Sequence, residues 1–226
     1  MPKVVRFHQL GGPEVLKFED QASREPKARE VRIRVQAVGL NRAEALYARG
    51  QYLEQPRLPS GLGYEAAGII EAVGPDVDRT WIGHKVATVP GFSLNDYPVL
   101  GEEAVVPVAN IAPYPEKLTP TEAAAMWMQY LTAWGGLVNL GRITKDDFIV
   151  ISAASSSVGV AAIQIAKEQG AIAIAIACLD AGKVDGDIEL RSSQLCLVVT
   201  DGGRPFVEMA IKSAALEAAA EAERAA

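Results

Sequence analysis

Cysteine, basic charge and long apolar runs are all scarce in this sequence of 226 residues. Its two cysteines, Cys178 and Cys196, are too few for a disulfide framework or for a zinc site of four thiolates. Lysine and arginine number 22 against 28 acidic residues, and the net charge of −6 does not indicate a broad basic face for nucleic acid. The longest apolar run, residues 171–179, is far shorter than the ~20 apolar residues that span a bilayer, and it fits a buried strand instead.

The beginning of the sequence, Met1 to Arg6, also lacks the apolar core of a signal peptide. Apolar residues make up 49% of the chain and charged residues 22%, which is the composition of a globular protein with a sizeable core. We therefore expect a cytoplasmic protein without a nucleic-acid or membrane partner.

The first half of the sequence has the pattern of short strands separated by turns. Residues 31–35 alternate apolar and charged side chains, with the period of two that marks a half-buried strand. Further strand candidates are residues 4–8, 67–73 and 85–89, and proline and glycine recur between them. This pattern predicts a compact, mostly β unit over residues 1–115.

After that unit the pattern changes to helices. Thr119 precedes Pro120 and Glu122 with the spacing of an N-cap, a first helical residue and a capping-box carboxylate. The small and apolar residues that follow, as far as Ala133, can continue the same helix. At the end of the chain, residues 206–226 are rich in alanine and glutamate and predict a long helix.

Between these helices lies a strand, turn, helix, strand pattern. Residues 148–152 form a continuous apolar run with β-branched side chains, as expected of a strand that is buried on both faces. Residues 158–169 have apolar side chains at helical spacing, and residues 171–177 resemble a second buried strand. A third apolar run covers residues 195–200. The pattern predicts a βαβ unit with a parallel sheet.

The turn after the first of these strands is rich in serine. In a dinucleotide-binding βαβ unit the diphosphate rests on backbone N–H groups at this position, and small residues let it approach the backbone. The usual fingerprint has three glycines, of which this chain has only one. The pattern leaves two interpretations open, a serine N-cap on a packed helix and a phosphate-binding turn. The candidate residues are Ser155, Ser156, Ser157, Val158 and Gly159.

Two charged residues beyond the second strand bear on the choice of nucleotide. Asp180 follows Gly159 at about the spacing of the acidic residue that binds a ribose hydroxyl and favours NAD. Lys183 lies close by and could instead meet a 2′-phosphate. These signals conflict, so the choice between NADH and NADPH stays open.

Five stretches of the sequence are more specific together than any of them alone. They are GGPEVL at 11–16, VGLNRAE at 38–44, GLGYEAAG at 61–68, YLTAW at 130–134 and the serine-rich turn at 153–159. In order and spacing they resemble the medium-chain dehydrogenase/reductase superfamily, and within it the zinc-free quinone oxidoreductase branch.

The resemblance implies an α/β protein of two domains. Residues 1–120 would be a GroES-like, β-rich substrate domain. Residues 121–226 would be a partial Rossmann-type dinucleotide-binding domain, with a parallel sheet, flanking helices and the alanine-rich helix at its end. The implied reaction is hydride transfer from NADPH or NADH to a small-molecule substrate, a quinone or another conjugated carbonyl compound.

The resemblance also bears on zinc. Zinc-dependent relatives place a cysteine where this chain has Asn41 and a histidine where it has Tyr64. Neither residue is a good zinc ligand, because zinc prefers thiolate, imidazole or carboxylate. The two histidines, His8 and His84, are not at the ligand positions. We therefore expect no bound metal.

Without zinc the substrate carbonyl must be polarised by hydrogen bonds. The resemblance points to Asn41 as the amide donor, with Tyr47 and Tyr52 near the pocket, although ordinary packing explains both tyrosines equally well. It places Thr132 beside the nicotinamide ring and suggests that Glu65 is a buried structural carboxylate.

Members of this family are longer than this chain, and the last strands of the Rossmann sheet have no counterpart in it. We therefore expect a C-terminally shortened member, in which an unpaired sheet edge favours a homodimer. An alternative is a catalytically weak or inactive member that acts as a binding or scaffold protein.

Overall fold

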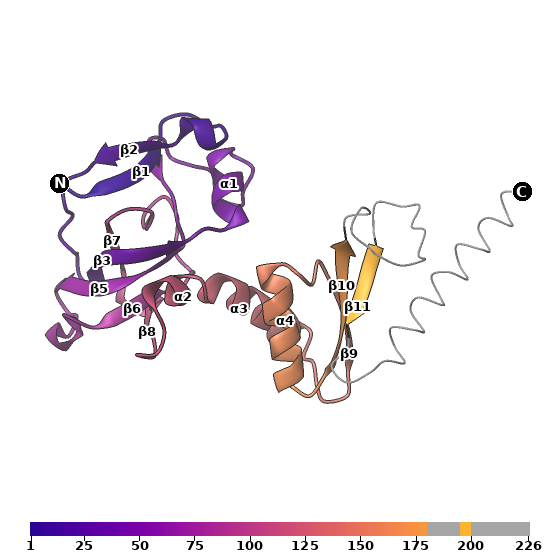
Figure 1. Ribbon diagram of the computed structural model, residues 1–226. Helices are drawn as coiled ribbons and strands as arrows, with labels where there is room; N and C mark the ends of the chain where they lie inside the picture. The colour runs from indigo at the N-terminus through magenta and orange to yellow at the C-terminus, as the bar shows by residue number, and fades with distance from the viewer. Residues whose placement is uncertain (180–194, 200–226) are drawn as a thin grey trace, which may run out of the picture. The chain divides into compact units, whose positions relative to one another are not determined.

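The computed structural model describes residues 1–179 and 195–199, in which the chain forms two compact units (Figure 1). The first unit comprises Met1–Met128 and the second begins at Gln129. Asp180, Lys183 and the predicted C-terminal helix lie outside the described residues.

The first unit is built from two antiparallel sheets. One has five strands in the order β7-β3-β5-β6-β8, and the other has three strands in the order β2-β1-β4. The strands are β1 (Lys3–Phe7), β2 (Lys17–Asp20), β3 (Glu30–Gly39), β4 (Ser60–Gly61), β5 (Glu65–Val73), β6 (Lys85–Thr88), β7 (Glu103–Pro107) and β8 (Ile111–Pro113). The helices are α1 (Arg42–Ala48), α2 (Pro120–Ala124) and the 3₁₀ turns η1 (Pro13–Val15), η2 (Arg79–Trp81) and η3 (Val108–Asn110). The four strands predicted for this half are confirmed as β1, β3, β5 and β6.

The long β3–β5 ladder determines where the candidate site lies. The two strands pair antiparallel from Val31 opposite Val73 to Gly39 opposite Glu65. The end of β3, which leads into α1, is therefore held beside the start of β5. As a result Asn41, two residues after Gly39, lies close to Glu65.

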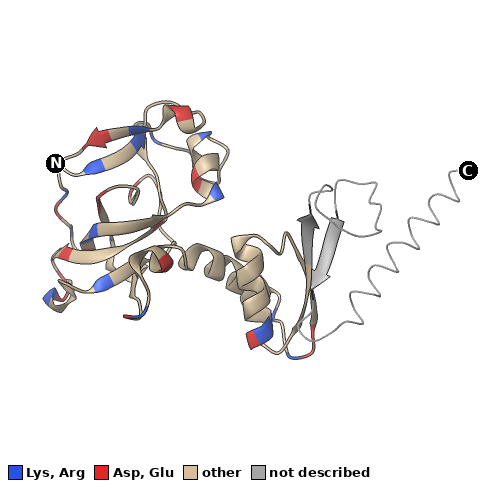
Figure 2. Cartoon of the chain, in the orientation of Figure 1, with Lys and Arg blue, Asp and Glu red and all other residues tan. Residues whose placement is uncertain are grey.

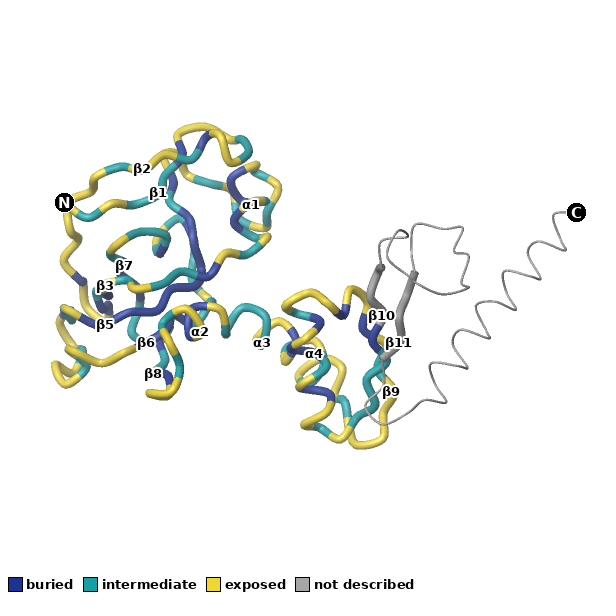
Figure 3. The backbone as a smooth tube through the Cα atoms, in the orientation of Figure 1, coloured by how far each residue is buried: buried dark blue, intermediate teal, exposed yellow. Residues whose placement is uncertain are grey.

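Three apolar clusters lie in the first unit, where Figure 3 shows buried backbone, and two of them pack around the sheets and α1. The cluster on the five-stranded sheet includes Val31, Ile33 and Ile70, each at most 1% exposed. The other cluster joins the three-stranded sheet to α1 through Phe7 and Tyr47, whose rings meet edge to face at 5.9 Å. The helix that carries the site is thus fixed against a closely packed core.

The helix predicted from Thr119 to Ala133 is broken in two, so that prediction is wrong. Its start is confirmed, because Thr119 and Glu122 form a capping box at the N-terminus of α2. That helix ends at Ala124, and a separate helix, α3 (Trp127–Trp134), follows. In one continuous helix the Met128 N–H would bond to the carbonyl of Ala124, but instead it donates to Glu65 Oε1 at 2.8 Å. A buried side-chain acceptor has replaced the helical one.

The second unit contains the end of α3 and the predicted βαβ pattern. Its elements are the π-helix η4 (Gly135–Leu140), β9 (Phe148–Ser152), α4 (Ser157–Glu168), β10 (Ile172–Leu179) and β11 (Leu195–Val199). The sheet order is β11-β10-β9, and β9 and β10 run parallel, with α4 between them in sequence. The Rossmann-like strand, helix, strand unit is therefore confirmed.

Two details of the second unit differ from the expectation. The strand β11 pairs with β10 antiparallel, which needs only a loop connection, whereas a parallel neighbour needs a crossover. The strand β9 is not buried on both faces. Ile151 packs in a core with Ala162 and Ile165 of α4, while Phe148 is 57% exposed. Within the described residues, only one face of β9 is covered.

Basic and acidic residues are interspersed along the ribbon of the first unit (Figure 2). Several form exposed ion pairs, such as Arg34 with Glu71 at 2.7 Å. Pairs of this kind add little to stability, because water and salt screen them. Among the described helices, none has the length and apolar character that crossing a bilayer requires.

The close approach of α2 to the end of β3 predicts a strong effect of substitution at Gly39. A Cβ there would lie 2.2 Å from the Ala124 carbonyl oxygen and 2.9 Å from Glu65 Cβ. We expect Gly39→Ala to lower the free energy of unfolding by about 1–3 kcal/mol, as measured by urea denaturation. Gly136→Ala, where a Cβ meets nothing within 4 Å, is the control and should not destabilise the protein. Equal stability of the Gly39 variant and the wild type would contradict the assigned packing.

Candidate functional site

Asn41 lies at the N-terminus of α1, where β3 ends. Its backbone N–H donates to Glu44 Oε2 at 2.7 Å, as the reciprocal half of a capping box. Glu44 is buried, and its Oε1 accepts a hydrogen bond from the N–H of Tyr64 at 3.2 Å. One carboxylate therefore fixes the start of α1 against the residue that precedes β5.

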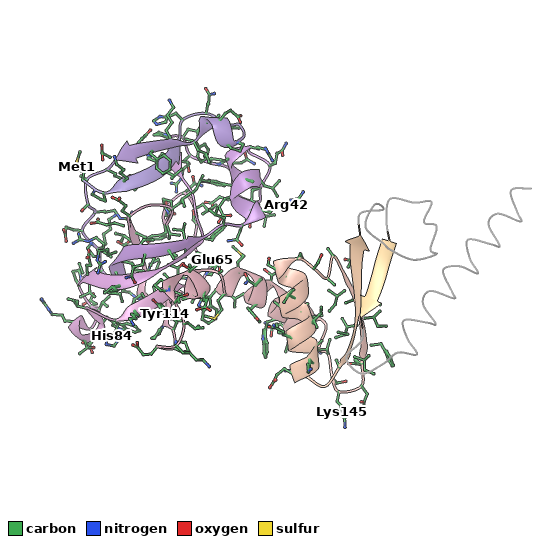
Figure 4. The ribbon with its side chains drawn as sticks, in the orientation of Figure 1. Met1, Arg42, Glu65, His84, Tyr114 and Lys145 are labelled. Atoms are coloured by element: carbon green, nitrogen blue, oxygen red, sulfur yellow. The ribbon has the colours of Figure 1, made fainter. Side chains whose placement is uncertain are left out.

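A second buried carboxylate, Glu65, which is labelled in Figure 4, is in direct contact with the Asn41 side chain. Glu65 is 2% exposed; its Oε2 accepts from Asn41 Nδ2 at 2.9 Å and its Oε1 from the Met128 N–H at 2.8 Å. Burying a charge is costly unless it is hydrogen-bonded, and here each oxygen has a donor. Gly39 leaves room for this carboxylate, since a Cβ there would lie 3.0 Å from Oε2.

The contact with Glu65 determines which way the Asn41 amide faces. Asn41 donates to Glu65 Oε2 through Nδ2, so the NH₂ group is the end of the amide that faces the carboxyl group. That group has two hydrogens, and the bond to Glu65 uses one of them. The Asn41 side chain is also hydrogen-bonded with the Glu44 carboxyl group, and it is half-buried. Two carboxyl groups, those of Glu65 and Glu44, therefore hold the Asn41 amide in one orientation at the start of α1.

Aromatic side chains form the surroundings of Tyr64 on the same side of the unit. The rings of Tyr52 and Tyr64 are 6.3 Å apart, and those of Tyr64 and Phe92 are 5.9 Å apart. Burial, followed by the neighbouring Tyr52, raises the pKa of Tyr64 well above the ordinary tyrosine value. Tyr64 is thus a neutral packing residue, and the half-buried Tyr52 is the tyrosine of this pair that is more accessible.

The structure places Tyr47 differently from the expectation that it lies at the pocket. Its side chain is 0% exposed, and its hydroxyl is hydrogen-bonded with Ser60 Oγ and donates to Asn95 Oδ1, both at 2.9 Å. A fully buried hydroxyl with two protein partners is not available to a substrate. Of the two interpretations of Tyr47, packing is the one that fits its position.

The serine-rich turn of the second unit joins β9 to α4. Ala153 has a positive φ of 51°, and Ser156 is the N-cap of α4, with Oγ accepting from the Gly159 N–H at 3.1 Å. A Cβ at residue 159 would lie 2.6 Å from the Ala153 carbonyl oxygen. Gly159 thus allows the helix to pack closely on the turn, and Ser156 acts as a helix cap.

The cap on Gly159 leaves two backbone donors at the start of α4. No hydrogen bond joins the N–H of Ser157 or Val158 to an acceptor in the described part of the chain. Both groups lie in the first turn of the helix, where the helix dipole also favours an anion. Gly159 allows close packing of the turn, and the N–H groups of Ser157 and Val158 are available. Both features suit the binding of a nucleotide diphosphate. The two interpretations of the turn are therefore compatible, because the cap and the available donors are different groups.

Thr132 and Trp134 are both exposed residues of α3 in the second unit. Asp180 and Lys183, the two candidates for recognising the ribose, lie outside the described residues. The described residues therefore include neither of the two side chains proposed to distinguish NADH from NADPH.

Sequence reasoning missed the role of Glu44. Its signal was present, because Asn41 and Glu44 have the spacing of a capping box at a helix start. It also missed the bond from Met128 to Glu65, for which no local pattern exists, since 63 positions separate the two residues.

Among residues 1–179 and 195–199, no group of three or more His, Cys, Asp or Glu side chains could hold a metal ion. The Asn41 side chain is hydrogen-bonded to Glu65, and the Tyr64 ring packs against Tyr52 and Phe92. The expectation that this protein works without zinc stays a prediction.

Comparisons with known proteins agree with the fold. The family described as "Alcohol dehydrogenase GroES-like domain" matches residues 27–116. Quinone oxidoreductase of Pseudomonas aeruginosa is 39% identical over 172 residues, covering 75% of this chain and 51% of that protein. Human quinone oxidoreductase is 35% identical over 169 residues, covering 74% of this chain and 50% of that protein.

Solved structures give the same result. The Pseudomonas syringae quinone oxidoreductase has a TM-score of 0.72 at 34% identity, covering 81% of this chain and 54% of that one. The Escherichia coli quinone oxidoreductase, in complex with NADPH, has a TM-score of 0.70 at 30% identity, covering 78% and 53%. The chain spans about half the length of the curated relatives that it matches.

The buried Glu44 carboxyl group predicts a pH-dependent contribution to stability. Burial raises its pKa above the ordinary value of 4.5, against the hydrogen bonds that lower it. A carboxyl group with a raised pKa stabilises the fold when protonated, and that contribution is lost as the pH rises through the raised pKa. We expect the free energy of unfolding of the wild type, minus that of Glu44→Gln, to fall as the pH rises from about 4 to 7.

Urea denaturation at several pH values tests this expectation. Glu116→Gln, at a side chain that is 87% exposed, is the control for loss of a surface carboxylate. A difference between wild type and Glu44→Gln that grows with pH would show that the effect of burial has been misjudged.

Proposed function

Because the chain belongs to the medium-chain dehydrogenase/reductase superfamily and to its quinone oxidoreductase branch, we propose that it takes part in NAD(P)H-dependent reduction of a quinone or another conjugated carbonyl compound. Since the chain spans about half of these relatives, the activity of the whole protein is part of this proposal. The likeness to an NADPH complex supports the nicotinamide cofactor.

The observation that carries the proposal is the orientation of the Asn41 amide. Glu65 and Glu44 hold the Asn41 amide, whose Nδ2 would donate to a substrate oxygen. As a quinone or enone is reduced, negative charge develops on its carbonyl oxygen. A donor that is already oriented stabilises that charge without reorganising during the reaction.

Tyr52 is the second candidate at this site. Its phenolic O–H can donate to the same oxygen or limit the space around it. Tyr47 has no such role, since its hydroxyl is held by Ser60 and Asn95.

In the second unit the residues of the turn would hold the cofactor's diphosphate. The N–H groups of Ser157 and Val158 would donate to its oxygens, Gly159 would let the start of α4 pack closely on the turn, and Ser155 and Thr132 would lie along the nucleotide. When bound, the reduced nicotinamide supplies the hydride, while the protein supplies binding and orientation.

Zinc independence, a homodimer and a cytoplasmic location complete the proposal. Parallel titrations with NADPH and NADH, followed by tryptophan fluorescence, would test cofactor binding and preference. Metal analysis of the same sample would test zinc independence. Absence of binding to either nucleotide would contradict the proposal and favour the alternative of a non-catalytic scaffold.

Substitutions at Ser157 separate the backbone donor from the side chain. Ser157 is the first helical residue, where proline is tolerated, and Ser156 has the extended conformation, φ −73° and ψ 162°, that proline requires before it. Ser157→Pro removes one proposed phosphate donor and should weaken NADPH binding by roughly ten- to a hundredfold.

Ser157→Ala is the matched control, because it keeps the N–H and should change the affinity much less. Calorimetric titration measures both. Equal affinities of the proline variant and the wild type would exclude this N–H from the phosphate site.

Removal of the Asn41 amide tests the substrate site. We expect Asn41→Ala to lower the rate of NAD(P)H oxidation with 1,4-benzoquinone by roughly ten- to a thousandfold, through loss of the carbonyl donor. Arg42→Ala, at the exposed next residue of α1, is the control and should keep the wild-type rate. Nucleotide affinity should be unchanged in both variants, and an unaltered rate for Asn41→Ala would remove Asn41 from its assigned role.

A further inference from the structure

The segment between α1 and β4, which carries Tyr52, contains no helix or strand. Its first residues are tied to α1 by backbone hydrogen bonds from the N–H groups of Gly50 and Gln51, and beyond them side chains must hold the segment. Its exposed ion pair, Arg57 with Asp96, has side chains that are 68% and 55% exposed, and such pairs contribute little. The fixed position of Tyr52 therefore needs another cause.

Asn95, which lies in a neighbouring loop, holds the segment that carries Tyr52. Its Nδ2 donates to Glu54 Oε1 at 2.7 Å and to the Gln55 carbonyl oxygen at 2.9 Å. Its Oδ1 accepts from the Arg57 N–H at 2.6 Å and from the Tyr47 hydroxyl at 2.9 Å. An asparagine amide has two donor hydrogens and two acceptor lone pairs, and these four bonds use all of them. Three of the four bonds join Asn95 to the segment that carries Tyr52.

The other side of this contact is anchored in the core. Leu94, next to Asn95, is 0% exposed, and its N–H donates to Glu54 Oε2 at 3.1 Å. Ser93 Oγ also donates to Glu54, and it accepts from the Asn95 N–H at 3.1 Å. Asn95 is thus itself held by its neighbours, and it transfers the rigidity of the core to the segment.

The same two loops meet again at the aromatic cluster of the candidate site. Tyr52, two residues before Glu54, packs on Tyr64, and so does Phe92, three residues before Asn95. Tyr64 directly precedes Glu65, which orients the Asn41 amide. The polar contact at Asn95 therefore sets the position of Tyr52 relative to Asn41.

We infer that Asn95 is a positioning residue for the substrate site: it holds residues 51–58 so that Tyr52 lies against Tyr64 beside the Asn41 amide. It touches neither substrate nor cofactor. The inference rests on the proposed reductase function and assigns a specificity-determining role to a loop that carries none of the proposed catalytic groups.

Asn95→Asp tests this inference with almost no change of shape. The substitution replaces the NH₂ group by an oxygen that faces the Glu54 carboxylate and the Gln55 carbonyl, so two hydrogen bonds become repulsive contacts. Hydrogen–deuterium exchange should show faster exchange in peptides covering residues 51–58, by about tenfold or more, with the β3–β5 ladder unchanged. Asn110→Asp is the matched control, since Asn110 Nδ2 donates to the Val89 carbonyl, away from the segment, and should leave this exchange unaltered.

Kinetics separate positioning from general stability. Asn95→Asp should raise the KM for 1,4-benzoquinone about tenfold, with a smaller change in kcat and no change in the Kd for NADPH. Glu54→Gln in the Asn95→Asp background places an amide NH₂ group of residue 54 opposite the new carboxylate of residue 95, so that a hydrogen bond can form again. The double variant should therefore recover the slow exchange, and its KM should return most of the way to the wild-type value.

The outcomes are distinguishable. Wild-type exchange in residues 51–58 of Asn95→Asp would overturn the inference, whatever the activity. So would a loosened segment with an unaltered KM. Absence of quinone reduction by the wild-type chain would instead overturn the proposed function, and this role of Asn95 with it.

Discussion

The buried carboxylate of Glu65 is the interaction on which the arrangement of the first unit depends. A carboxyl group that is 2% exposed is stabilised here because both of its oxygens accept hydrogen bonds, from Asn41 and from Met128. These donors come from the start of α1 and the start of α3, while Glu65 itself begins β5. One side chain therefore fixes three elements, ends one helix, begins another and orients the amide at the candidate site.

The two units support their sites by different means. In the first unit buried carboxylates and an asparagine amide orient side chains through hydrogen bonds, with closely packed apolar clusters behind them. In the second unit the proposed site is a stretch of backbone, shaped by the absence of a side chain at Gly159 and by the cap from Ser156. A carbonyl oxygen needs a single directed donor, whereas a diphosphate is bound by several N–H groups at a helix start.

Much of this organisation follows from local patterns. The alternation at residues 31–35 predicted β3, the spacing of Thr119 and Glu122 predicted the start of α2, and the serine-rich turn predicted the junction of β9 and α4. The features that local patterns did not determine have a common cause. The extent of the helix after Thr119 and the burial of Tyr47 depend on residues distant in sequence, such as Glu65 and Asn95, which no local period can indicate.

The sequence alone determined four strands of the first unit, the strand, helix, strand unit of the second, the family resemblance and the candidate status of Asn41, because residue spacing and side-chain chemistry are local properties. Only the tertiary structure decided that Glu65 orients this amide, that Tyr47 belongs to the core, that Tyr52 remains accessible and that Asn95 holds its segment. The physical reason is that burial and hydrogen-bond partnership are created by the β3–β5 ladder and the packed loops, which bring together residues separated by tens of positions.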